Sequence, residues 1–247
     1  MTLTPASARR RAALNPEIPA PTTEVITGTP EPVAPQAAKA APEAPLRYLA
    51  EDLGKDHHVY AGASKDASDI VAALPSAEAF EADLTDTDAI LGAASQIEEL
   101  DVLVLAAGVM EHGPLEELTD EKWREMMEVN LFAPVTLTRA LLPALRRSSG
   151  LIITINSGAG FQGFAENSAY CASKFALRGF TESLQEEEAG KVRVTSLHPG
   201  RTDTDMLAGD DGRPKMDAAE VAKAARLAVD AGPDAVVEFL RVRPART

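Results

Sequence analysis

Residues 151–174 read LIITINSGAGFQGFAENSAYCASK. The apolar run 151–155 is followed by the glycines of Ser157-Gly158-Ala159-Gly160 and then by helix-forming residues from 169 to 188. This order predicts a strand, a glycine turn and a helix. If the helix begins near Asn167, Tyr170 and Lys174 lie four residues apart on one helix face, where side chains are neighbours.

The pairing of Tyr170 with Lys174 has a chemical consequence. A free tyrosine has a pKa of roughly 10, and a lysine cation within about 4 to 6 Å favours the phenolate and lowers that pKa. Tyr170 then suits general acid or base work. Ser157, if its strand end lies beside the helix, can hydrogen-bond the substrate oxygen that Tyr170 protonates. Together they suit hydride transfer to a carbonyl; the alternative is an ordinary helix pair with an ordinary turn serine.

The same residues resemble the active-site signature of the short-chain dehydrogenase/reductase family, in which a serine at a strand end precedes Tyr-x-x-x-Lys by thirteen residues. Further matches run from about Leu53 to Pro244. The resemblance implies an α/β fold with a doubly wound parallel sheet of the Rossmann type and helices on both faces. It also implies an NADP-dependent, carbonyl-reductase-like enzyme.

Composition limits the class of protein. A chain of 247 residues suits one α/β domain, and we expect a disordered tail over residues 1–22 and a single domain over 23–247. The net charge of −14 argues against nucleic acid or an anionic membrane as partner. No apolar run reaches the ~18 residues of a membrane span. One cysteine, Cys171, excludes an internal disulfide and a cysteine metal cage and favours a cytoplasmic location; no metal site is expected.

The N-terminal region departs from the family pattern. Residues 23–28 resemble the first strand entering the phosphate-binding turn, which makes Gly28 a cofactor-binding candidate, but the positions four and six residues later are Pro32 and Ala34. Counting back from Leu53 places the turn glycines at Ala40, Ala44 and Leu46 instead. Prolines at 30, 32, 35, 42 and 45 oppose a regular helix and remove amide donors, so residues 29–46 are expected to be irregular. An insertion, a loss of cofactor binding and a corrupted reading frame all remain open explanations.

Three later positions bear on the cofactor. After the predicted second strand, Lys65 stands where the family distinguishes NAD from NADP, and the absence of an acid there favours NADP(H), with NAD(H) as the alternative. Asp83 matches the residue beside the adenine ring, or else it N-caps a helix starting near Thr85. Ala107 and Gly108 keep the small residues along which the family's cofactor passes, although the usual asparagines are absent.

Asn130 lies within the apolar stripe of a helical segment from 119 to 147. A buried asparagine without partners costs roughly 1 to 3 kcal/mol, so we expect it to have partners. Pro134 has no N–H for the carbonyl of residue 130. In the family the matching asparagine holds, through its main chain, a water that relays protons to the lysine. The alternative is a kink that wraps the core.

The segment after residue 192 resembles the family's last strands. The strand 192–197 leads into a Pro-Gly-x-x-x-Thr loop, in which Pro199, Thr202 and Thr204 are candidates for contacts with the nicotinamide. Residues 207–216 would form a short substrate flap. Asp217 would N-cap a helix over 218–229, and residues 236–240 would form the final strand.

The sequence therefore predicts an oxidoreductase in which Tyr170 is the general acid, Lys174 lowers its pKa and holds the nicotinamide ribose, Ser157 orients the carbonyl, and Asn130 supports the relay. A small-molecule carbonyl or alcohol would be the substrate. The resemblance implies a homodimer or homotetramer formed through helices 119–147 and 169–188. A protein that keeps the fold without catalysis, because its phosphate turn is lost, is the competing hypothesis. Substrate identity, direction and oligomer size stay open.

Overall fold

A computed structural model describes residues 22–26, 43–63, 67–207, 212–232 and 234–245. Within them, seven parallel strands form one sheet in the order β3-β2-β1-β4-β5-β6-β7. The strands are β1 (Thr22–Ile26), β2 (His58–Ala63), β3 (Ala77–Glu81), β4 (Val102–Leu105), β5 (Leu151–Ile155), β6 (Arg193–Pro199) and β7 (Phe239–Val242). The chain runs outward from β1 to β3 and returns beside β1 at β4. Open α/β sheets bind ligands at such a switch point.

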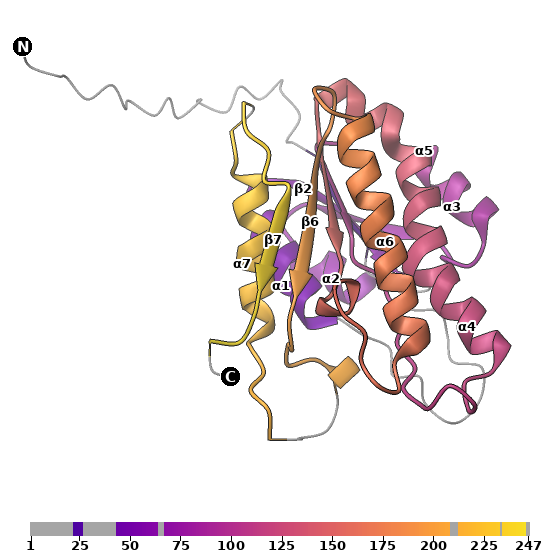
Figure 1. Cartoon of the computed structure of the whole chain (residues 1–247). Coiled ribbons are helices and arrows are strands. Elements are labelled where there is room, and N and C mark those ends of the chain that lie inside the picture. Colours follow the sequence, from indigo (N-terminus) through magenta and orange to yellow (C-terminus); the bar gives the residue numbers. More distant parts are fainter. Residues whose placement is uncertain (1–21, 27–42, 64–66, 208–211, 233, 246–247) are drawn as a thin grey trace, which may run out of the picture.

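Helices cover both faces of the sheet (Figure 1). They are α1 (Glu43–Leu53), α2 (Ser68–Ala73), α3 (Thr87–Ala94), α4 (Asp120–Met127), α5 (Ala133–Ser148), α6 (Ser168–Glu187) and α7 (Ala218–Val229). Helices α3, α5 and α6 pack on one face, and α1 and α7 on the other. Among the described helices, none has the length and apolarity needed to cross a bilayer. The predicted doubly wound parallel fold is confirmed.

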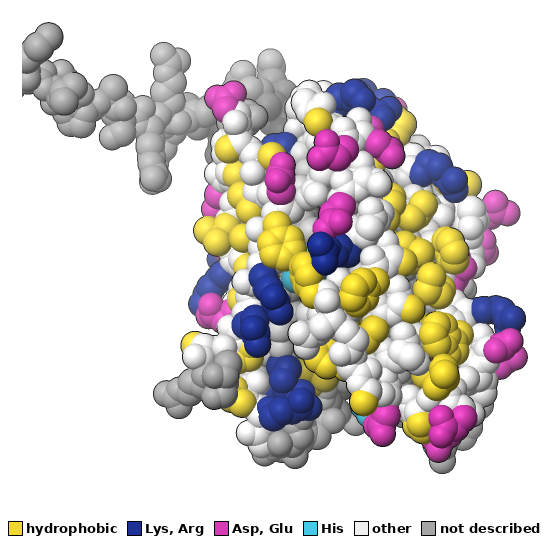
Figure 2. Space-filling model, viewed as in Figure 1, with side chains coloured by type: hydrophobic (Ala, Val, Ile, Leu, Met, Phe, Trp, Pro, Cys, Tyr) yellow, Lys and Arg dark blue, Asp and Glu magenta, His cyan; other side chains and the backbone are white. Residues whose placement is uncertain are grey.

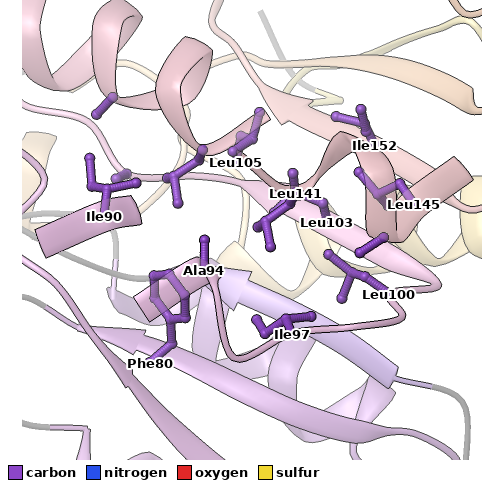
Figure 3. Close-up of a cluster of buried hydrophobic side chains, with 14 of the residues drawn as sticks. Phe80, Ile90, Ala94, Ile97, Leu100, Leu103, Leu105, Leu141, Leu145 and Ile152 are labelled. Carbon is purple, nitrogen blue, oxygen red and sulfur yellow. The ribbon is translucent and has the colours of Figure 1, made fainter. Parts of the chain in front are cut away.

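Alternation along the central strands builds the two cores. Leu103 and Ile152 belong to the cluster under α3 and α5 (Figure 3), whereas Val104 and Ile153 belong to the cluster under α1 and α7. Successive strand residues point to opposite faces, and both faces are covered here. This explains why β4 and β5 are continuous apolar runs.

The structure corrects the N-terminal expectations. Helix α1 begins at Glu43, so the prediction of irregular backbone over 29–46 is wrong for residues 43–46. Pro45 lies in the first turn, where a helix needs no N–H from it. Thr22, predicted to end the tail, pairs with His58 as the first residue of β1. Gly28, Lys65 and the remainder of segment 29–46 lie outside the described residues, as do residues 1–21.

Two helix caps can be compared with expectation. Asp217 accepts a hydrogen bond from the Ala219 N–H at 2.8 Å and caps α7, as predicted. Asp83 does not cap α3, because Asp86 is the residue that accepts hydrogen bonds from the N–H groups of the first turn. Asp83 instead accepts from the backbone N–H and hydroxyl of Thr85. The final strand begins at Phe239 and not at residue 236. The pairing of Phe239 with Ser196 on β6 selects the register.

Candidate functional site

The turn after β5 places Ser157. Asn156 Oδ1 accepts from the Ser157 N–H at 2.8 Å, and the Ser157 Oγ accepts from the Ala159 N–H at 3.1 Å, capping a short 3-10 turn, Gly158–Gly160. A Cβ on Gly160 would lie 2.6 Å from Asn156 Oδ1, so this position requires glycine. Asn156 also donates to the carbonyl of Lys174 at 3.3 Å. It joins the serine turn to α6, a role that sequence reasoning missed.

Tyr170 and Lys174 lie one turn apart on α6, as the spacing predicts, and both are buried. The Lys174 Nζ is 5.9 Å from the centroid of the Tyr170 ring. It donates to the carbonyl of Ile155 at 3.2 Å. The ammonium is thus held at the carboxyl end of β5, between the tyrosine and the strand.

Burial controls the ionisation of this pair. It raises the pKa of Tyr170, and the side chain of Ser157 opposes that rise. Burial also lowers the pKa of Lys174 to about 8. The expected net lowering of the Tyr170 pKa is therefore not found, because loss of solvent disfavours the phenolate more than the hydrogen bond with Ser157 favours it. Tyr170 is a neutral phenol at neutral pH in this environment.

Asn130 sits in a π-helical turn, Glu128–Phe132, between α4 and α5. The predicted continuous helix is interrupted here, where the Ala133 N–H donates to the Glu128 carbonyl. Turns of this kind are frequent at functional sites. Asn130 is fully buried and, as expected, has hydrogen-bond partners: it donates to the Val109 carbonyl and to the Ser173 Oγ, each at 2.9 Å. The side chain thus joins the end of β4 to α6.

Gly108 lies where these elements meet. A Cβ there would be 3.2 Å from Asn130 Oδ1 and 3.5 Å from Lys174 Nζ. Ala107 beside it is buried. The small residues therefore let the loop after β4 approach the lysine closely.

One cavity of about 970 Å³ opens along the carboxyl ends of the strands. The candidate residues that line it are Gly108, Ser157, Tyr170, Lys174, Pro199, Thr202 and Thr204. Ala107 and Asn130 lie behind its wall. Asp83 is exposed and does not line it. The cavity brings most of the predicted residues together.

The loop after β6 closes one side of the cavity. The Thr202 hydroxyl donates to the carbonyl of Gly200 at 3.1 Å. Met216, at the far end of the predicted flap, exchanges backbone hydrogen bonds with Arg201 and Asp203, each at 2.9 Å. Met216 is therefore tied to this loop.

His198 is a residue that sequence reasoning missed. It is fully buried in β6, with Nδ1 3.1 Å from the Ser157 carbonyl and Nε2 2.7 Å from Ser196 Oγ. Burial lowers its pKa to about 4, although the hydrogen bond with the Ser157 carbonyl acts in the opposite direction. The neutral ring therefore supports the serine turn from below. The feature of the sequence that could have pointed to this role is a histidine at the end of an apolar strand.

Comparison with known proteins agrees with this geometry. The sequence model of the short chain dehydrogenase family matches residues 37–213 of the chain. The chain is 36% identical to trans-4-hydroxycyclohexanecarboxylate dehydrogenase of Sinomonas cyclohexanicum over 51% of each chain. It is 37% identical to an uncharacterized oxidoreductase of Staphylococcus saprophyticus, over 59% of this chain and 64% of the relative. It thus spans between half and two thirds of these curated relatives.

Solved structures match over more of their length. A short chain dehydrogenase from Burkholderia cenocepacia in complex with NADP has a TM-score of 0.72 and 28% identity, and the match covers 90% of each chain.

Proposed function

Because the chain belongs to the short-chain dehydrogenase family, we propose that it transfers a hydride between NADP(H) and a carbonyl or alcohol substrate, with Tyr170 as general acid and base. The observation that carries this proposal is the convergence of Ser157, Tyr170 and Lys174 on one cavity at the carboxyl end of β5. NADPH would supply the hydride.

The residues present suit a dinucleotide at the switch point. Ala106 and Gly108 form a wall of small side chains after β4, the strand beside β1. The Lys174 ammonium and the Thr204 hydroxyl lie in the same cavity as hydrogen-bond donors. We assign Lys174 to the nicotinamide ribose, and Pro199, Thr202 and Thr204 to the nicotinamide. Ala107 would support the wall from behind.

The chain's own groups would manage the developing charge. As a carbonyl carbon accepts hydride, negative charge grows on its oxygen. Tyr170, kept neutral by burial, donates its proton to that oxygen, and the Ser157 hydroxyl holds the oxygen by a hydrogen bond. The Lys174 ammonium, 5.9 Å from the ring, stabilises the phenolate that remains. Asn130 would support the proton relay to Lys174 through its main-chain carbonyl. Pro134 has no N–H to donate to that carbonyl.

A second function, a binding protein without catalysis, is kept as the alternative because residues 29–42 lack the family's glycines. Titrating NADPH against the purified protein while following nicotinamide fluorescence separates the two. Saturable binding supports the enzyme, and its absence at millimolar NADPH supports the alternative. Replacing residues 39–47 with Thr-Gly-Ala-Ser-Arg-Gly-Ile-Gly-Arg should then strengthen NADPH binding by at least tenfold, about 1.4 kcal/mol.

The choice between NADPH and NADH is a separate proposal. Lys65 is the basic residue after β2, and we propose that it favours the 2′-phosphate of NADPH, with Asp83 near the adenine. NADPH should bind more tightly than NADH, and Lys65→Glu should narrow that preference. Equal affinities in the parent protein would remove this role from Lys65.

We also propose a cytoplasmic homodimer or homotetramer formed through α4, α5 and α6. Phe132 and Phe175 are 50% and 45% exposed, and Figure 2 shows hydrophobic side chains gathered over α5 and α6. A patch of this kind favours association. Sedimentation of the Phe132→Ser/Phe175→Ser variant should show a smaller particle than the parent protein; an unchanged mass would contradict this surface assignment.

A further inference from the structure

The cavity carries the opposite charge to the rest of the chain. The protein has 38 acidic and 24 basic residues. Among the described residues that line the cavity, none is acidic, whereas Lys174, Arg201, Arg213, Arg241 and Arg243 are basic. The described lining of the cavity is therefore basic, although the chain as a whole is acidic, and a basic lining favours anions over cations.

Arg241 and Arg243 belong to the edge of the sheet. Arg241 lies in β7 and Arg243 directly follows the last residue of that strand, and both line the cavity. The Gly200 N–H donates to the Val242 carbonyl at 2.7 Å, which ties the end of β7 to the loop that carries the nicotinamide-binding candidates. The Arg241 guanidinium lies 5.3 Å from the centroid of the Phe161 ring. Figure 2 shows a column of Lys and Arg side chains descending below the position of β7.

Neither arginine forms an ion pair with a carboxylate in the part of the chain that the structure describes. Several arginines that do not line the cavity have carboxylate partners: Arg146 with Glu188, Arg178 with Glu182, and Arg226 with Asp56. In a chain with surplus acid, two arginines on a cavity wall without such partners are available to an external anion. A guanidinium binds carboxylates through paired hydrogen bonds.

The position of β7 separates this anion from the cofactor phosphates. Dinucleotide phosphates belong at the switch point beside β1. Neighbouring strands lie about 4.8 Å apart, so β7 is about 19 Å from β1 but only about 10 Å from β5, which leads to Ser157. The arginines are therefore on the substrate side of the reacting centre.

We propose that Arg241 and Arg243 bind a carboxylate of the substrate, so that the enzyme interconverts an oxo acid and its hydroxy acid. This inference rests on the proposed hydride transfer. The carboxylate would sit several bonds from the carbonyl, across the cavity from Tyr170. The subsite selects for negative charge and leaves the rest of the substrate to the apolar lining.

The test compares 4-formylbenzoate with its neutral amide, 4-formylbenzamide. The parent protein should show at least about tenfold higher kcat/KM for the acid, and Arg241→Gln/Arg243→Gln should remove this preference by raising KM for the acid about tenfold. The kcat/KM for the amide and the Kd for NADPH should not change. Arg139→Gln, which removes one exposed charge on α5, is the control and should behave as the parent protein.

Calorimetric binding of 4-formylbenzoate separates this proposal from the catalytic one. Arginine-dependent binding without reduction would retain the subsite and overturn the hydride-transfer function. Reduction of both aldehydes with no dependence on either arginine would retain the function and overturn the subsite. Absence of both binding and reduction would overturn both. Stronger competition by inorganic phosphate than by benzoate would overturn the assignment to a carboxylate.

Discussion

Asn130 satisfies both backbone groups of Val109: its Oδ1 accepts from the Val109 N–H at 2.8 Å, and its Nδ2 donates to the Val109 carbonyl at 2.9 Å. A side chain on the π-helical turn thereby takes the place of a neighbouring strand for the loop after β4. Because the same Nδ2 reaches Ser173 on α6, one amide sets the distance between three elements around Lys174.

Replacing Asn130 should therefore destabilise the protein. Asn130→Ala leaves the N–H and carbonyl of Val109 buried without partners, and we expect unfolding in urea to require about 2 to 4 kcal/mol less free energy. Gln96→Ala, an exposed change, should cost little. A loss below about 0.5 kcal/mol for Asn130→Ala would contradict the bridging role.

Tyr170→Phe tests the general acid. The change removes one proton donor and almost no packing volume, so carbonyl reduction should fall by about 10² to 10⁴ while the unfolding transition stays in place. Tyr48→Phe, at an exposed position on α1, is the matched control. Retention of more than about a tenth of the parent rate in Tyr170→Phe would rule out the assignment.

Lys174 should lower the stability of the folded protein at neutral pH, although activity requires it. Its pKa lies near 8, below the ordinary 10.5, because burial penalises the ammonium. The unfolded chain therefore binds more protons between about pH 8 and 10.5, and the folded protein gains stability as pH rises through that window. Lys174→Met should lose activity yet gain on the order of 1 to 2 kcal/mol at pH 7, since the lost bond to Ile155 offsets part of the benefit. The gain should vanish near pH 10.5; Lys223→Met is the exposed control.

His198 should make the fold sensitive to acid. Its pKa of about 4 in the folded state is below the ordinary 6.5, so its contribution to stability is complete above pH 6.5 and is lost as pH falls toward 4. The loss is on the order of 3 kcal/mol. His198→Asn keeps a donor for the Ser157 carbonyl and removes the titrating ring. Urea unfolding at pH 7 and pH 4.5 should show a smaller decrease for this variant than for the parent protein or for His112→Asn; equal decreases would show that His198 does not carry the effect.

Local sequence was sufficient for the parts of the fold that depend on backbone periodicity. The apolar runs of β4 and β5, the four-residue spacing of Tyr170 and Lys174, and the cap at Asp217 all follow from geometry within a few residues. The resemblance to the family added the sheet topology and the catalytic assignment, because it rests on motifs spread along the chain. Boundaries such as those of α1 and β7 were less predictable, since proline tolerance and strand pairing depend on the neighbours of each element.

Only the tertiary structure decided the electrostatics and the long-range contacts. Whether burial or Lys174 controls the pKa of Tyr170 depends on how much solvent the packed helices exclude, which no spacing reveals. The partners of Asn130 lie 21 and 43 residues away, and His198 reaches a carbonyl 41 residues earlier. Arg241 and Arg243 become part of the cavity only because β7 is added beside β6 in parallel. Such contacts arise from the packing of distant segments, so the sequence specifies them through the fold and not through any local pattern.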